Sequence, residues 1–141
     1  MGRPDIAHAV SYLSQLNSTY QAQHWKAAKR VLRYLKLTCS YGITYPSNSD
    51  GKLVGFVDAD WGVCIIDRRS YTGYCFLLNE GCITWESRKQ QTTALSTVEA
   101  EYMGLAEAAK ETIYLRNLLG EVGLPCTEAI NWVMTIRELN S

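Results

Sequence analysis

Two pairs of acidic residues are the part of this sequence best suited to chemistry. Asp58 and Asp60 stand at the end of an apolar segment, and Glu99 and Glu101 open a long amphipathic segment. Carboxylate oxygens bind hard cations such as Mg²⁺, and a bound cation in turn contacts the phosphate of a substrate. If a strand and a helix bring these side chains together, the expected chemistry is metal-dependent cleavage of a phosphodiester.

Spacing separates the two glutamates. Ser96 and Glu99 form a capping box at the start of a predicted helix, so capping already accounts for Glu99. Glu101 lies three residues after Val98 and four before Leu105, beside the stripe expected to pack on a sheet. A carboxylate beside a buried face is costly unless it is paired or bound to a metal, which favours Glu101 as a ligand. The alternative is a partly exposed charge at a helix start.

On the strand side, Asp58 and Asp60 share one face of a strand predicted from Lys52 to Ala59. Aspartate is a poor strand former, so two of them at the end of an apolar strand indicate either a function or the surface. The sequence leaves open that this strand end simply passes into a polar loop.

A basic stripe is the second candidate surface. Residues 4–37 predict two helices, and the second has an apolar face that includes Trp25, Val31 and Leu35. Positive charge of uniform sign on the opposite face suits contact with nucleic-acid phosphates, and a solvated outer face is the alternative. The stripe consists of Lys26, Lys29, Arg30, Arg33 and Lys36.

Composition limits the remaining possibilities. The 141 residues are enough for one domain with a real core, and 47% apolar and 20% charged residues are ordinary for a globular protein. The formal net charge is zero, so any nucleic-acid footprint must be local. No apolar run approaches the roughly 20 residues that span a bilayer, and we expect no membrane association.

The cysteines indicate a reducing compartment. Five cysteines without a CxxC pair favour reduced, mostly buried thiols in the cytoplasm rather than a zinc site. Cys75 and Cys82 flank a predicted tight turn, and a bond between them is the alternative.

The elements that must position the acidic residues follow from local patterns. Residues 70–78 and 82–86 predict a hairpin around Asn79-Glu80-Gly81, followed by a polar segment up to Thr93. A helix is predicted from Thr97 to Leu119, with Gly120 as its C-terminal glycine. Residues 129–136 form one more strand or a short helix. The stripe expected to be buried by the long helix is Val98, Tyr102, Leu105, Ala109 and Ile113.

Four local motifs occur in a fixed order. They are DADW at residues 58–61, DRRS with GY at 67–74, ITW at 83–85, and ALS followed by EAEY at 94–102. Together they resemble the ribonuclease H domain of copia-type retrotransposon Pol polyproteins. In this comparison, residues 1–46 are similar to the helical connection segment at the end of the reverse transcriptase. Residues 50–124 resemble a partial ribonuclease H-like domain, and residues 125–141 form a divergent tail.

The resemblance implies an α/β fold in which flanking helices cover a mixed sheet. It also implies cleavage of the RNA strand of RNA–DNA hybrids by two Mg²⁺ ions, with Mn²⁺ as a possible substitute, held by four acidic residues. By position, Asp58 matches the aspartate that bridges both metals and Glu101 matches the helix glutamate. The implied partners are an RNA–DNA hybrid, or another nucleic acid, and the reverse transcriptase part of the same polyprotein.

The third and fourth acids of the family are missing. The third belongs to a CDN-like strand after the long helix, but residues 124–128 lead to no Asp-Asn and no aspartate follows Asp67. Glu128 is a poor replacement, because hard-cation sites are sensitive to ligand placement. We therefore expect a ribonuclease H-like fold that is incomplete at its C-terminus, with an open sheet edge beside the Asp58 strand. The expected function is an impaired nuclease, and the alternative is a non-catalytic remnant that at most binds nucleic acid.

Overall fold

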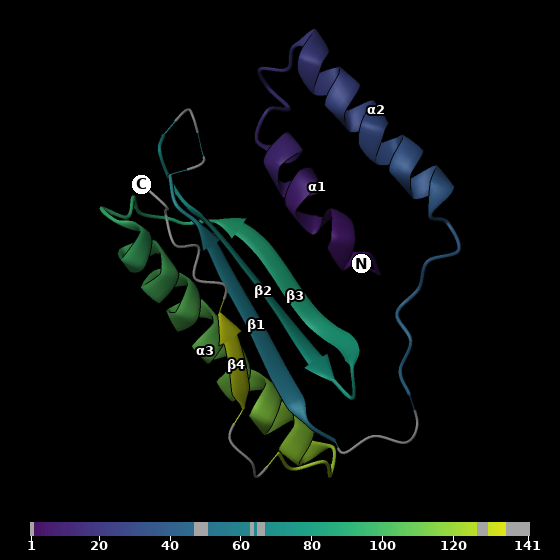
Figure 1. The fold of residues 1–141 in the computed structure, drawn as a ribbon, viewed down its shortest axis with the longest axis vertical. Helices are drawn as coiled ribbons and strands as arrows, with labels where there is room; N and C mark the ends of the chain where they lie inside the picture. The colour runs from purple at the N-terminus through teal and green to yellow at the C-terminus, as the bar shows by residue number, and fades with distance from the viewer. Residues whose placement is uncertain (1, 47–50, 63, 65–66, 127–129, 135–141) are drawn as a thin grey trace. The chain divides into compact units, whose positions relative to one another are not determined.

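The computed structural model describes residues 2–46, 51–62, 64, 67–126 and 130–134 (Figure 1). The chain divides into two compact units, Met1–Thr44 and Tyr45–Ser141. The first unit contains a 3-10 turn at Pro4–Ile6 and two helices, α1 at Ala7–Ser14 and α2 at Ala22–Leu37. The prediction of two helices within residues 4–37 is therefore confirmed.

The second unit is a four-stranded mixed sheet with one long helix along one face (Figure 1). The strand order is β3-β2-β1-β4, in which β1–β2 and β2–β3 are antiparallel and β1–β4 is parallel. This α/β architecture is compatible with the expected ribonuclease H-like fold. Its elements are β1 at Leu53–Asp60, β2 at Tyr71–Leu78, β3 at Gly81–Lys89, α3 at Thr97–Glu121 and β4 at Asn131–Met134.

The expectation of an open edge along the Asp58 strand is wrong. β4 pairs in parallel with β1, from Val54 opposite Asn131 to Val57 opposite Met134. Trp132 secures this strand, because its ring meets Phe76 edge to face with the ring centroids 5.5 Å apart. The tail therefore contributes to the sheet and to its core.

The core explains the glycine in β1. A Cβ on Gly55 would lie 3.0 Å from Phe76 Cε1 and 3.2 Å from Trp132 Cε3, so only glycine leaves room for both rings. Phe76 itself is fully buried. The buried cluster around it consists of Leu53, Val57, Ala108, Leu115 and Leu119.

The hairpin between β2 and β3 forms as predicted but is longer. Asn79 and Glu80 have φ values of 55° and 64°, which are the two positive angles of a two-residue hairpin turn. β3 continues to Lys89 instead of ending at Glu86, because its last three residues pair with Tyr71–Gly73 of β2. The polar side chains of residues 87–89 gave no strand pattern in the sequence, although the backbone of these residues pairs with β2.

α3 turns a different face to the sheet than predicted. Its buried residues are the mostly small Ala100, Gly104 and Ala108, followed by Leu115 and Leu119. A Cβ on Gly104 would lie 3.3 Å from Thr72 Cγ2, so small side chains allow the helix to approach the sheet closely. The expected buried stripe is wrong: Val98, Tyr102 and Ile113 are 57%, 68% and 63% exposed.

The end of α3 also differs from the prediction. Gly120 is helical, and the residue in the left-handed region is Gly123, with φ of 82°. The amide of Leu124 donates to the carbonyl of Leu119 at 2.8 Å, and that of Gly123 donates to Gly120 at 3.2 Å. These two bonds are the Schellman pattern, which places the glycine two residues beyond the helix.

Candidate functional site

The structure places the two predicted acidic residues at one narrow depression. Asp58 lies near the end of β1, and Glu101 lies in the second turn of α3. Both line the same small depression, together with Val57, Ala59 and Met134. Each of the two acidic residues is half-buried. Strand pairing with β4 on one side and helix packing on the other therefore define the walls of this depression.

Glu101 borders the buried face of α3, although the stripe used to predict this was the wrong one. It follows the fully buried Ala100 and precedes the buried Gly104 by three residues. Glu101 therefore lies beside the buried residues of α3, as its spacing predicted, because helical positions three apart are neighbours.

Glu99 is a capping residue, as its position predicted. Its amide donates to Ser96 Oγ at 3.1 Å, and its Oε2 accepts from the amide of Leu95 at 2.6 Å. The return bond thus reaches one residue further back than in the usual capping box. Glu99 is exposed and does not line the depression beside Asp58.

Asp58 and Glu101 are the two acidic residues among those that line the depression, and no third acidic residue of the described chain lines it. The described residues contain no group of three or more His, Cys, Asp or Glu side chains suited to a metal ion. β4 occupies the place beside β1, but Asn131–Met134 contains no acidic residue. Glu128 lies outside the described residues. Two carboxylates suit one Mg²⁺, which commonly completes its shell with water and substrate phosphate, but not two ions.

The aspartate of the DRRS motif anchors a loop rather than joining the site. Asp67 Oδ2 lies 2.8 Å from Lys89 Nζ, and its Oδ1 accepts from the amide of Arg69 at 3.3 Å. Hydrogen bonding from the Cys64 thiol and from the Lys89 ammonium holds the pKa of Asp67 well below its usual range. The next residue, Arg68, has a φ of 57°, and its amide donates to the carbonyl of Cys64 at 2.8 Å.

Trp61 and Gln90 attach the start of α3 to the sheet. The Trp61 indole N–H donates to the carbonyl of Ala94 at 3.1 Å. Gln90 Nε2 donates to Thr72 Oγ1 and to the carbonyl of Ala100, both at 2.9 Å. Gln90 is only 7% exposed, and sequence reasoning missed it because an amide after a polar strand end carries no periodic signal. These bonds set the position of Glu101 relative to β1.

The basic stripe on α2 is exposed along its length. Lys26, Lys29, Arg30, Arg33 and Lys36 are all exposed. None of the five forms an ion pair within the part of the chain that the structure describes. Beside the stripe, Trp25 is 57% exposed and Lys29 Nζ lies 5.4 Å from its ring centroid.

The zero net charge of the chain hides a division between its two units. Residues 1–44 contain six basic and one acidic residue, a formal charge of +5, whereas residues 45–141 contain eight basic and thirteen acidic residues, a charge of −5. The positive charge of the first unit therefore comes almost entirely from the stripe on α2. This local footprint is invisible in the whole-chain total.

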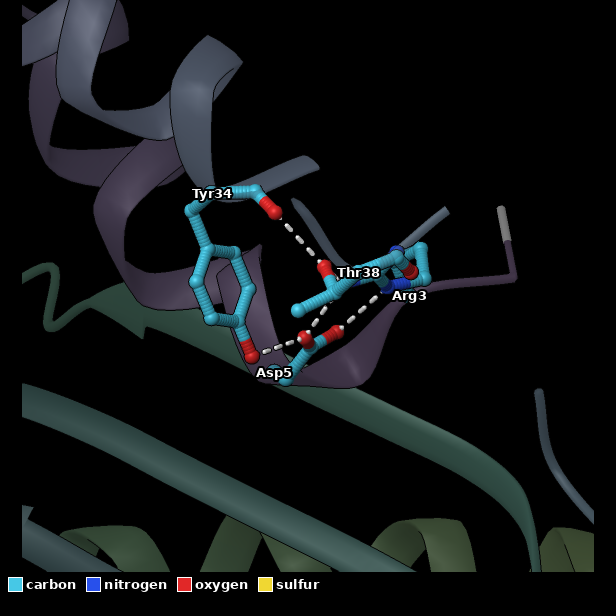
Figure 2. Close-up of polar contacts among 4 residues, drawn as sticks. All are labelled: Arg3, Asp5, Tyr34 and Thr38. Atoms are coloured by element: carbon cyan, nitrogen blue, oxygen red, sulfur yellow. Dashed lines mark hydrogen bonds and ion pairs between the residues drawn. The ribbon is translucent and has the colours of Figure 1, made fainter. Parts of the chain in front are cut away.

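The remaining charged pair of the first unit has a structural role (Figure 2). The Arg3 guanidinium binds both carboxylate oxygens of Asp5, at 2.9 and 2.8 Å, and also donates to the carbonyl and hydroxyl oxygens of Thr38. The Tyr34 hydroxyl donates to Asp5 Oδ2 at 2.8 Å. Hydrogen bonds from Arg3 and Tyr34 hold the pKa of Asp5 well below its usual range. The network joins the first residues of the chain to the end of α2.

Among the described helices, none combines the length and the apolar character needed to cross a bilayer. The fold and the site together define an α/β domain in which a strand aspartate and a helix glutamate line one depression. The chain also contains a separate basic helical unit. No protein-family model matches the chain, and no solved structure matches it.

Curated relatives identify the family. The chain is 51% identical over 113 residues to the secreted RxLR effector protein 161 of Plasmopara viticola, covering 80% of each protein. It is 44% identical over 122 residues to the retrovirus-related Pol polyprotein from transposon TNT 1-94 of Nicotiana tabacum, and 38% identical over 125 residues to that from transposon RE1 of Arabidopsis thaliana. The chain spans 9% and 8% of those two polyproteins. It belongs to the copia-type retrotransposon Pol family and is a Pol-derived segment.

Proposed function

We propose that this chain is a ribonuclease H-like segment of a copia-type Pol protein that retains half of a two-metal site. Its cleavage of the RNA strand of RNA–DNA hybrids is impaired relative to a complete domain. The observation that supports this proposal is that Asp58 and Glu101, distant in sequence, line one depression between β1 and α3. The reverse transcriptase part of the same polyprotein is the proposed protein partner.

The donor set determines what this site can hold. The carboxylates of Asp58 and Glu101 would hold one Mg²⁺, or Mn²⁺, and a bound ion supplies Lewis-acid activation of water and of the phosphate oxygen. Val57, Ala59 and Met134 form the apolar part of the lining of this depression. The described residues contain no group of three or more His, Cys, Asp or Glu side chains suited to a metal ion, and this shortage of ligands for a second ion is the proposed physical reason for impaired cleavage.

Cleavage of an end-labelled RNA–DNA hybrid by the purified chain, in Mg²⁺ and then in Mn²⁺, tests the nuclease proposal. Asp58→Asn removes a charged ligand at nearly constant volume, and Asp60→Asn is the matched control on the same strand, outside the depression. We expect weak cleavage that Asp58→Asn abolishes and Asp60→Asn retains. Equal loss in both variants, or no loss in either, contradicts a site at Asp58. No cleavage by a folded sample would favour the binding function below.

The second candidate function is binding of nucleic acid without cleavage. It is supported by the exposed stripe on α2, where five cations of one sign lie on a unit with a charge of +5. Each phosphate contact releases counterions, so five contacts predict a slope of log K against log salt of about −4 to −5 on duplex DNA. The exposed ring of Trp25 adds a surface on which an unpaired base can stack.

Fluorescence anisotropy with a labelled hybrid tests the binding function. Changing both Arg30 and Arg33 to Gln should reduce the salt slope by roughly two and weaken binding uniformly across sequences. Lys110→Gln is the matched control, since this side chain is 71% exposed but lies on the acidic unit. An unchanged slope in the double variant, or an equal loss in the control, excludes the α2 stripe as the binding surface.

A further inference from the structure

The outer face of α3 carries an apolar stripe that no described element of its own unit covers. Val98, Tyr102 and Ile113 are 57%, 68% and 63% exposed, and the half-buried Leu105 and Ala109 lie between them on the same face. Sequence periodicity predicted this stripe to be buried, but the sheet is covered by the small residues on the other side of the helix. A contiguous apolar face of this kind indicates an interaction surface.

The stripe is symmetric about its central residue. From Val98 it continues through Tyr102, Leu105, Ala109, Ile113, Arg116 and Gly120, in steps of four, three, four, four, three and four residues. The spacing reads the same from either end, with Ala109 in the middle. A helix face with palindromic spacing can pack antiparallel on the same face of a second copy. Each residue then lies opposite the residue at an equal distance on the other side of Ala109.

We propose that the outer stripe of α3 is a homodimer interface, on which the α3 helix of a second copy packs antiparallel about a two-fold axis at Ala109. In this arrangement the two Ala109 side chains meet at the axis, and their small size allows a close approach of the helices. Leu105 of each copy faces Ile113 of the other, and the interface is isologous.

The outer positions are complementary in size and charge. Val98 faces the partner subunit's Gly120, where nothing lies within 4 Å of the position a Cβ would take. Tyr102 faces the partner subunit's Arg116, and both side chains are exposed, so the guanidinium can rest on the ring. A large side chain thus meets a small one, and a cation meets an aromatic ring.

The distribution of charge along α3 favours the antiparallel direction. The first half of the helix carries Glu99, Glu101 and Glu107 and has a net charge of −3. The second half has a net charge of zero, from Lys110, Glu111, Arg116 and Glu121. Antiparallel packing places the neutral half of each helix beside the partner's acidic half and opposes the two helix dipoles. Parallel packing would align acidic residues with acidic residues.

Sedimentation equilibrium of the 141-residue chain, over a range of concentrations, tests this interface. We expect a monomer–dimer equilibrium, with the mass rising from 15.9 kDa toward twice that value. Ile113→Glu should weaken dimerisation at least tenfold, because it places two charges in the apolar stripe. Tyr114→Glu is the matched control, since Tyr114 is the next residue, is 59% exposed and lies off the stripe. Circular dichroism checks that both variants keep their helix content.

Cysteine cross-linking distinguishes the direction of packing. In the antiparallel dimer, a mixture of Leu105→Cys and Ile113→Cys chains should form a covalent heterodimer, whereas each variant alone should not cross-link through its new thiol. A monomer at all concentrations overturns the proposal and assigns the stripe to a different partner, such as another segment of the polyprotein. Equal weakening by Ile113→Glu and Tyr114→Glu, or cross-linking of Leu105→Cys with itself, also overturns it.

Discussion

Replacing Trp132 by alanine tests whether the tail of the chain is part of the folded domain. This residue belongs to the four-residue β4, and its ring meets the fully buried Phe76 with centroids 5.5 Å apart, above Gly55. Truncation of a buried aromatic side chain costs about 3–5 kcal/mol. Trp132 is only half-buried, which reduces the packing loss to roughly half, and the edge-to-face pair adds about 0.5–1.5 kcal/mol. We therefore expect a loss of about 2–4 kcal/mol in the free energy of unfolding.

Urea unfolding followed by circular dichroism measures this loss. Circular dichroism is preferable to fluorescence, because the chain contains four tryptophans. The midpoint should fall while the m value stays constant, and thermal unfolding should show a decrease in Tm of roughly 10–20 °C for a domain of this size.

Val133→Ala provides the matched control for the tail. Val133 is the next residue of the same strand, is 45% exposed and lies on the opposite face, so its truncation should cost less than about 1 kcal/mol. If the two variants unfold at the same urea concentration, Trp132 does not contribute to the core. The account of β4 as the strand that closes the edge beside Asp58 would then be refuted.

Three further changes probe contacts that support the site and the fold. The pKa of Asp67 is lower in the folded chain than in the unfolded one, so its contribution to stability is present above about pH 4 and is lost as the pH falls toward the folded pKa. The Asp67→Asn variant should therefore be less stable at pH 7. Its free energy of unfolding, measured between pH 6 and 2, should depend less on pH than that of the original chain. Gly123→Ala should cost about 1 kcal/mol in urea unfolding, because its φ of 82° is strained for alanine, whereas Gly120→Ala, within the helix, should not destabilise the chain. Cys75 and Cys82 are free thiols with sulfur atoms 3.0 Å apart, and burial raises the pKa of Cys75 to about 12. Oxidised glutathione should therefore convert them into a disulfide slowly at pH 7 and roughly a hundredfold faster at pH 9, in proportion to the thiolate fraction. Mass spectrometry detects the loss of two hydrogens, two glutathione thiols are released, and equal rates at both pH values would contradict this expectation.

Local interactions explain which elements could be predicted from the sequence. The start of α3 follows from Ser96 and Glu99, which bond to amides within four residues. The turn at Asn79 and Glu80 depends on the two positive φ angles of a short hairpin loop. In both cases neighbouring residues supply the stabilising contacts, so the pattern along the chain carries the information.

The family, too, could be inferred from the sequence. Four motifs in a fixed order identified a copia-type Pol segment, and the Pol relatives at 38–44% identity confirm that assignment. The roles of the motif residues are a separate matter, because Asp67 and Trp61 proved to hold the loop and the start of α3 in place.

Contacts between distant parts of the chain decided the rest. Residues 129–136 were predicted as either a strand or a short helix. Residues 131–134 form a strand because β1 supplies hydrogen-bonding partners and Phe76 a surface for Trp132. The face of α3 that meets the sheet was mispredicted, since close approach selects small residues over the larger apolar ones.

The sequence alone thus determined the family, the order of most elements and the identity of Asp58 and Glu101 as candidate ligands. Only the tertiary structure decided that these two residues line one depression, that no third acidic residue among the described ones joins them, and that an apolar stripe on α3 is exposed. The physical reason is that propensities and caps act within a few residues. The meeting of a strand end with a helix depends instead on the packing of the whole sheet.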